Sequence, residues 1–96
     1  MCMIHEQIKN SIKEAMMAKD EVRLLTYRNM LSSFTNELVS KGKKPNEMLP
    51  DEEALMVIKR MVKKGNKAIE LFKQGSRNDL VEKEMEEIKI LESYIK

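Results

Sequence analysis

The stretch IKEAMMAKDEVRLLTY, residues 12–27, decides the fold because two helical patterns meet inside it with almost no residues between them. On both sides of the link, apolar residues recur at spacings of three and four, which places them on one side of an α-helix. Asp20 is well suited to cap the second helix, since its short side chain can accept a hydrogen bond from a free backbone N–H. A link this short makes the two helices antiparallel neighbours.

The second half of the chain predicts another helical hairpin. Pro50 suits the first position of a helix, and the three acidic residues after it complement the positive end of the helix dipole. In the turn QGSRND, residues 74–79, Gly75 can take the left-handed conformation that ends a helix. Ser76 with Asp79 resembles a capping box, which predicts that the next helix starts here.

Composition and patterning together predict an all-α fold. The chain has three glycines and two prolines, and it is rich in Lys, Glu, Met, Leu and Ile, which lose little side-chain freedom in a helix. Each helix is apolar on one side only, so the helices must bury these sides against one another. We expect a small four-helix bundle made of two antiparallel helical hairpins, joined by the loop 40–50, in a single domain spanning residues 1–96. The expected helices run over residues 3–18, 20–40, 51–73 and 77–95.

Length, charge and cysteine content limit the classes of function. The 96 residues form one modest domain, and a formal charge of +2 does not by itself indicate a nucleic-acid partner. The single cysteine, Cys2, excludes an intramolecular disulfide, and no apolar run approaches the ~20 residues that cross a bilayer. The N-terminus MCMIHEQIKN lacks the pattern of a signal peptide. These features predict a cytoplasmic protein that does not bind a membrane.

One basic face stands out against this near-neutral background. The stretch IKRMVKKGNK, residues 58–67, carries five cations that fall within about 140° of helical arc and span roughly 12 Å, opposite the apolar side of the same helix. Such a face can meet a few successive phosphates. It can equally be a solvated surface whose lysines pair with the glutamates of the 77–95 helix, and both interpretations stay open. The five cations are Lys59, Arg60, Lys63, Lys64 and Lys67.

Residues with the chemistry for catalysis or metal binding are scarce. His5 has no second histidine or cysteine at ligand spacing and is expected on the surface near the terminus, so we predict no metal site and no cofactor. Carboxylate pairs are common but lack a cleft that would desolvate one acid, so we predict no catalytic residues. Tyr27, Phe34 and Phe72 are expected in the core rather than as stacking platforms for bases.

Two long stretches carry a resemblance to a known family. KEAMMAKDEVRLLTYRNMLSS, residues 13–33, and FKQGSRNDLVEKEMEEIKILESYI, residues 72–95, resemble the YqeY-like family, whose members are similar to the tail domain of the B subunit of the tRNA-dependent Asp/Glu amidotransferase. The resemblance covers almost the whole chain and includes polar positions that helical periodicity does not fix, such as Arg77. It implies an all-helical fold and a tRNA-binding role, with any amidotransferase activity belonging to partner subunits.

The chain departs from the family's pattern at Gly65 and in its length. Gly65 stands where an arginine is frequent, which removes one cation and costs roughly 1 kcal/mol of helix propensity against alanine. Family members usually continue into a second small helical subdomain after the tyrosine that corresponds to Tyr94, and the sequence ends at Lys96.

These observations lead to a predicted function with one alternative. We expect a non-catalytic helical module that binds tRNA through the basic face, with tRNA as its partner and no metal or cofactor. Further cations expected to extend the surface are Arg23 and Arg28 and the loop residues Lys41, Lys43 and Lys44. The alternative is a protein-interaction or scaffold domain that uses an exposed methionine-rich patch, with Met56, Met61 and Met85 as candidates.

Overall fold

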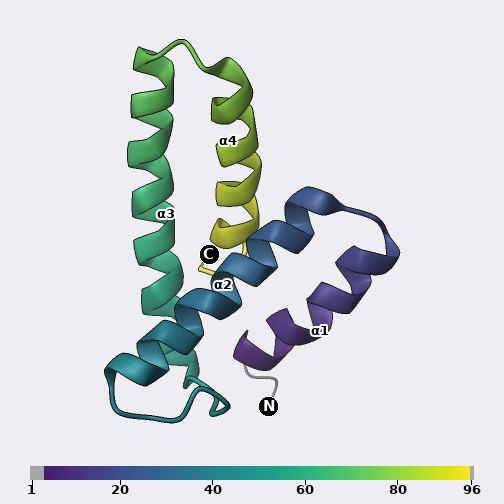
Figure 1. Ribbon diagram of the computed structural model, residues 1–96, viewed down its shortest axis with the longest axis vertical. Coiled ribbons are helices and arrows are strands. Elements are labelled where there is room, and N and C mark those ends of the chain that lie inside the picture. Colours follow the sequence, from purple (N-terminus) through teal and green to yellow (C-terminus); the bar gives the residue numbers. More distant parts are fainter. Residues whose placement is uncertain (1–3, 96) are drawn as a thin grey trace.

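The computed structural model describes residues 4–95 and contains four α-helices. They are α1 (Ile4–Met17), α2 (Glu21–Ser40), α3 (Asp51–Gln74) and α4 (Asn78–Glu92). Helices α1 and α2 form one antiparallel hairpin, and α3 and α4 form the second (Figure 1). The predicted all-α class and the two hairpins are confirmed, and each helix begins and ends within three residues of its expected range. Residue 3, where the first helix was expected to start, lies outside the described residues, as does Cys2.

The two hairpins cross one another rather than lying side by side. In Figure 1, α2 runs diagonally across the lower part of the second hairpin, and α2 contacts both α3 and α4. The turn between α3 and α4 stands at the far end of the molecule, away from α1 and α2. The resulting molecule has principal extents of 41 × 31 × 23 Å.

The core lies where the hairpins cross. Burying a large apolar side chain there contributes about 1.5–3 kcal/mol relative to leaving it exposed, so these contacts dominate the stability of the bundle. The two core aromatics, Tyr27 and Phe34, are buried as predicted, and Phe72 is half-buried. The largest fully buried apolar side chains are Ile8, Met30, Phe34, Leu38, Leu49 and Ile58.

His5 belongs to this core, and its expected surface position is wrong. Its exposed fraction is 2 %, and its ring centroid lies 5.1 Å from that of Phe34. The backbone N–H of Leu49, in the loop that joins the hairpins, donates to His5 Nδ1 at 3.0 Å. A buried N–H without a partner is costly, so the imidazole serves as the acceptor that lets this loop segment pack over α1.

The start of α2 agrees with the sequence. The carboxylate of Asp20 accepts a hydrogen bond from the Arg23 backbone N–H at 3.1 Å, which confirms it as the N-cap. Pro50 was expected at the first position of α3 but lies one residue earlier, at the N-cap.

The turn between α3 and α4 differs from the prediction. Gly75 keeps a φ of −88°, and Ser76 takes the left-handed conformation with a φ of +57°. The N-cap of α4 is Arg77, so Ser76 lies one residue too early to form the expected capping box. The carboxylate of Asp79 instead contacts the Arg77 guanidinium at 3.4 Å, which lowers the pKa of Asp79.

Candidate nucleic-acid interface

The five predicted cations of α3 are all exposed, because the opposite side of the helix is buried. Val57 and Ile58 pack into the core, and the helical period then turns the basic residues to solvent. The positions that follow this pattern are Lys59, Arg60, Lys63, Lys64 and Lys67.

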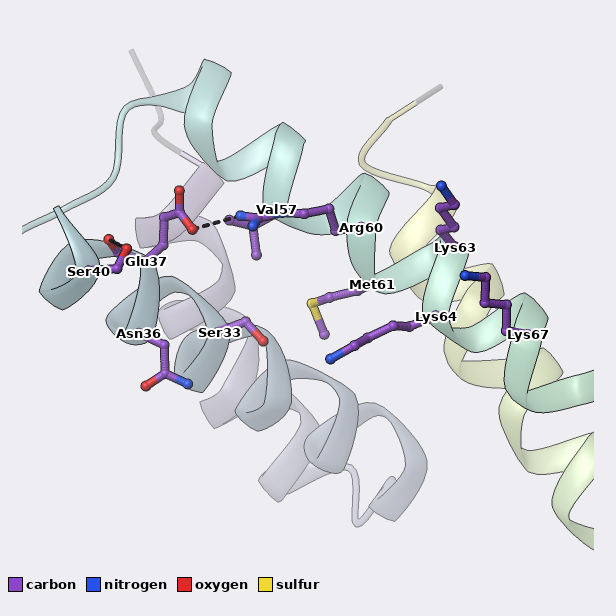
Figure 2. Close-up of a pocket in the computed structure, with 10 residues that line it drawn as sticks. All are labelled: Ser33, Asn36, Glu37, Ser40, Val57, Arg60, Met61, Lys63, Lys64 and Lys67. Carbon is purple, nitrogen blue, oxygen red and sulfur yellow. Dashed lines mark hydrogen bonds and ion pairs between the residues drawn. The ribbon is translucent and has the colours of Figure 1, made fainter. Parts of the chain in front are cut away.

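An open groove of about 630 Å³ runs between these cations and α2, and we call it the α2–α3 groove (Figure 2). Its basic wall consists of four of the five predicted cations and omits Lys59. The side chain of Lys64 extends from α3 toward α2, beside Met61 (Figure 2). The four cations that line the groove are Arg60, Lys63, Lys64 and Lys67.

The opposite wall is polar and was not predicted from the sequence. Ser33, Asn36, Glu37 and Ser40 of α2 line the groove. A second groove of about 470 Å³ shares Ser33, Met61 and Lys64 with the first and extends the polar wall to Asn29. The sequence did contain a signal, since small polar residues recur at helical spacing from Asn29 to Ser40.

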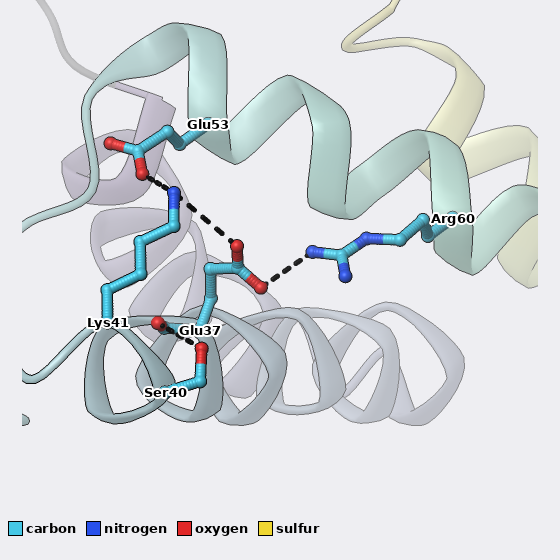
Figure 3. Close-up of polar contacts among 5 residues, drawn as sticks. All are labelled: Glu37, Ser40, Lys41, Glu53 and Arg60. Carbon is cyan, nitrogen blue, oxygen red and sulfur yellow. Dashed lines mark hydrogen bonds and ion pairs between the residues drawn. The ribbon is translucent and has the colours of Figure 1, made fainter.

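Glu37 introduces a negative charge into the α2–α3 groove. One of its carboxylate oxygens accepts a hydrogen bond from Arg60 Nη2 at 2.7 Å, and the other lies 3.5 Å from Lys41 Nζ (Figure 3). Lys41 also contacts the carboxylate of Glu53, at the start of α3. The hydrogen bond from Arg60 is the main cause that lowers the pKa of Glu37, so this carboxylate is charged at neutral pH.

The three lysines of the basic wall differ from Arg60 in their ion pairing. Within residues 4–95, no ion pair joins Lys63, Lys64 or Lys67 to a carboxylate, including the glutamates of α4. The pairing that the solvated-surface interpretation relied on is therefore not seen in this part of the chain. Three positive charges face the solvent of the groove and can be neutralised by a bound anion.

The remaining predicted cations do not join this groove. The Arg23 guanidinium donates to the Tyr27 hydroxyl at 2.9 Å and lies over its ring, with 5.7 Å from Cζ to the ring centroid. Arg28 lines a separate depression of about 340 Å³ between α2 and α4. Lys43 and Lys44 are exposed in the loop between the hairpins. The structure thus gathers four of the five α3 cations at the groove, and it places Arg23 and Arg28 elsewhere on the surface.

Two glutamates line the far end of the second groove. Glu84 and Glu87 of α4 line it together with Lys64 and Gly65. Partial burial, followed by the neighbouring Glu84 carboxylate, raises the pKa of Glu87. Among the described residues, no three His, Cys, Asp or Glu side chains are grouped so that they could hold a metal ion.

Comparison with known proteins places the chain in a family. The family model described as Yqey-like protein matches residues 5–96. The chain belongs to the YqeY-like family. This membership confirms the resemblance identified in the sequence, and the relationship to the amidotransferase tail domain is consistent with the family's name.

Several curated fungal proteins are similar to this YqeY-like chain, and each is named Altered inheritance of mitochondria protein 41, mitochondrial. The protein from Kluyveromyces lactis is 40% identical over 88 residues, covering 91% of this chain and 45% of the relative. The protein from Lachancea thermotolerans is 34% identical over 89 residues, covering 92% and 46%. The chain thus spans about half the length of the curated relatives it matches.

These names correct the expected cytoplasmic location, which is wrong. The fungal relatives are named as mitochondrial proteins, which contradicts the cytoplasmic expectation. A single cysteine excludes an internal disulfide but does not distinguish one reducing compartment from another, which is why composition misled the prediction. Separately, none of the helices within residues 4–95 has the length and apolar character that crossing a membrane requires.

Proposed function

We propose that this chain is a non-catalytic helical module that binds tRNA along the α2–α3 groove. The observation that carries the proposal is the row of Lys63, Lys64 and Lys67, which have no carboxylate partner in residues 4–95 and line one wall of the groove. Flexible ammonium groups at helical spacing suit the phosphates of a nucleic-acid backbone. Among the possible nucleic acids we favour tRNA, because members of the YqeY-like family resemble a tRNA-binding tail domain.

The expected mode of binding is electrostatic. Among the described lining residues none is aromatic, so the groove offers no platform on which bases would stack. Phosphates would lie on the lysine wall, and Ser33 and Asn36 across the groove would hydrogen-bond to phosphate or sugar oxygens. Binding of this kind reads the backbone rather than the base sequence. The module would therefore hold tRNA for chemistry, such as amidation, that partner subunits perform.

A protein-interaction role is the second candidate, and Met85 is the observation that favours it. Met85 is 54% exposed on α4, beside Ile69 in a depression that Glu82 and Glu86 also line. Met56 is 64% exposed, but it lies near the start of α3. Because α4 runs antiparallel to α3, Met85 faces a part of α3 that is roughly 18 Å further along the helix. Met61 is half-buried beside the basic wall. The three methionines therefore do not form one patch.

Fluorescence anisotropy against bulk tRNA across a salt series tests the proposed function. The four cations of the groove predict a log–log slope of affinity against salt of roughly −3 to −3.5. The triple variant Lys63→Glu, Lys64→Glu, Lys67→Glu should abolish binding. A matched control carries Lys13→Glu, Lys73→Glu and Lys89→Glu, which change the net charge equally at exposed positions outside the groove. The control should lose only the part of the affinity that depends on total charge, and equal losses in the two variants would contradict the proposal.

A further inference from the structure

We propose that Glu37 is an internal competitor for the phosphates of the bound strand, so that this carboxylate must be displaced from Arg60 before the groove is fully occupied. The inference rests on the proposed function and adds to it a residue that determines which anions bind. Glu37 is the one carboxylate among the described residues that line the α2–α3 groove.

The geometry places Glu37 where a ligand phosphate would be bound. Its carboxylate bridges Arg60 of α3 and Lys41 at the end of α2, with one oxygen directed at each cation (Figure 3). Arg60 and the lysines of the basic wall belong to the same helix face, so an anion that follows the lysines reaches Arg60 next (Figure 2). The carboxylate therefore occupies the position on Arg60 that the end of a phosphate row would take.

The ion pair has the features of a contact that can be exchanged. The Arg60 side chain is 62% exposed and that of Glu37 is 21% exposed, and the hydrogen bond between them uses Nη2 alone. A partly exposed pair of this kind contributes little stability, and a guanidinium that makes a single contact keeps other N–H donors free for a phosphate. Exchange requires only a side-chain rotation, because both residues lie at the surface of regular helices.

Competition of this kind favours chains of phosphates over single ones. A lone phosphate that binds Arg60 leaves the charge of Glu37 without its strongest partner, so the exchange yields little net binding free energy. A strand that is already held by Lys63, Lys64 and Lys67 brings its next phosphate to Arg60 at high effective concentration and completes the exchange. The carboxylate, which then keeps Lys41 but not Arg60 as a partner, attracts a cation from solution, and this makes the salt dependence of binding shallower by about one ion.

The variant Glu37→Gln tests the inference in the same anisotropy assay with bulk tRNA. Removal of the competitor should tighten binding about three- to tenfold near 0.1 M salt and steepen the log–log salt slope by about 0.7–0.9. Glu70→Gln is the matched control, since Glu70 is exposed on α3, does not line the groove and carries the same charge change. Glu53→Gln removes the second partner of Lys41 without touching Arg60, and thermal unfolding of each variant reports any loss of folded protein.

The Arg60→Gln background separates competition from a general gain of positive charge. In that background the gain from Glu37→Gln should shrink to that of Glu70→Gln, because the cation that the carboxylate blocks is already absent. A gain equal to that of Glu70→Gln while Arg60 is present, a weaker affinity, or an undiminished gain without Arg60 would each overturn the inference while leaving the lysine-dependent binding intact. Absence of tRNA binding by every form would instead reject the proposed function, and the inference with it.

Discussion

At the scale of single residues, the buried imidazole of His5 couples the stability of the fold to pH. Its Nδ1 accepts the Leu49 N–H, so this nitrogen must be unprotonated for the contact to exist. Burial, followed by the nearby charge of Lys9, lowers the pKa of His5 below its ordinary value of 6.5. The folded protein therefore holds this side chain neutral at a pH where the unfolded chain already binds a proton.

The free energy of unfolding is predicted to fall as the pH drops from about 7.5 to about 5. The unfolded state binds more protons than the folded state in this range, so the contribution of His5 is fully present above pH 6.5 and is lost as the pH falls through the lower folded pKa. Urea unfolding across the range measures the effect. His5→Asn keeps an acceptor near the position of Nδ1 but does not titrate, and its profile should be flatter. An equally steep profile in this variant would assign the pH dependence to other groups.

Gly65 is the second residue whose role depends on the packing of α3 against α4. It is buried, and a Cβ built on it would lie 2.9 Å from Ile88 Cγ1 and 3.1 Å from a Glu84 carboxylate oxygen. We predict that Gly65→Leu destabilises the protein by about 1–3 kcal/mol, as overpacking usually does. Gly65→Ala should lie closer to the natural protein, because a helix-propensity gain of about 1 kcal/mol offsets the crowding. Chemical denaturation measures both, and a Leu variant at least as stable as the natural chain would show that α4 moves aside freely.

At the scale of the elements, three of the helices end in the same way. The residue after each C-cap is left-handed: Lys19 with a φ of 55°, Gly42 with 76° and Ser76 with 57°. In each case the following N–H bonds back to a carbonyl five residues earlier, as in Arg77 to Phe72 at 2.8 Å. Only one of the three positions holds glycine, so the other two carry the steric cost of a left-handed side chain.

Ser76→Gly is predicted to raise the free energy of unfolding by about 0.5–1 kcal/mol. Glycine adopts the left-handed conformation without the clash of a Cβ, and this gain exceeds the added entropy of the unfolded chain. Gln74→Gly, placed in the last turn of α3, is the control and should destabilise the protein by up to about 1 kcal/mol. Thermal unfolding compares the two, and a Ser76→Gly variant that melts below the natural protein would contradict this explanation of the turn.

The elements also show which features a sequence can predict. The N-cap at Asp20 involves residues one helical turn apart, so the local sequence was enough to predict it. In the turn between α3 and α4, the left-handed residue was predicted at Gly75 but is Ser76. The position where α3 ends depends on tertiary packing as well as on the glycine. The burial of His5 depends on Leu49, 44 residues away, and no helical period connects the two.

At the scale of the whole molecule, the candidate site arises from the crossing of the hairpins. The basic wall was predictable because all its cations lie on one helix, whose period alone places them together. The polar wall belongs to α2, which crosses α3 (Figure 1). Phe34 and Leu38 of α2 share one buried core cluster with Ile58 of α3, and this shared core fixes how the two helices lie. The same crossing explains why Arg23 and Arg28, although on α2, lie outside the groove.

The central claim is that the α2–α3 groove is where the nucleic acid binds. A titration of the isotope-labelled chain with bulk tRNA, followed by backbone amide NMR, tests it most directly, because the method reports the location of contact as well as its strength. We predict that the signals of Ser33, Asn36, Ser40 and residues 60–67 shift or broaden first, and that the outer face of α4 is unaffected. Perturbations that centre on Met85 and the surrounding glutamates, or no perturbation at low salt, would contradict the claim.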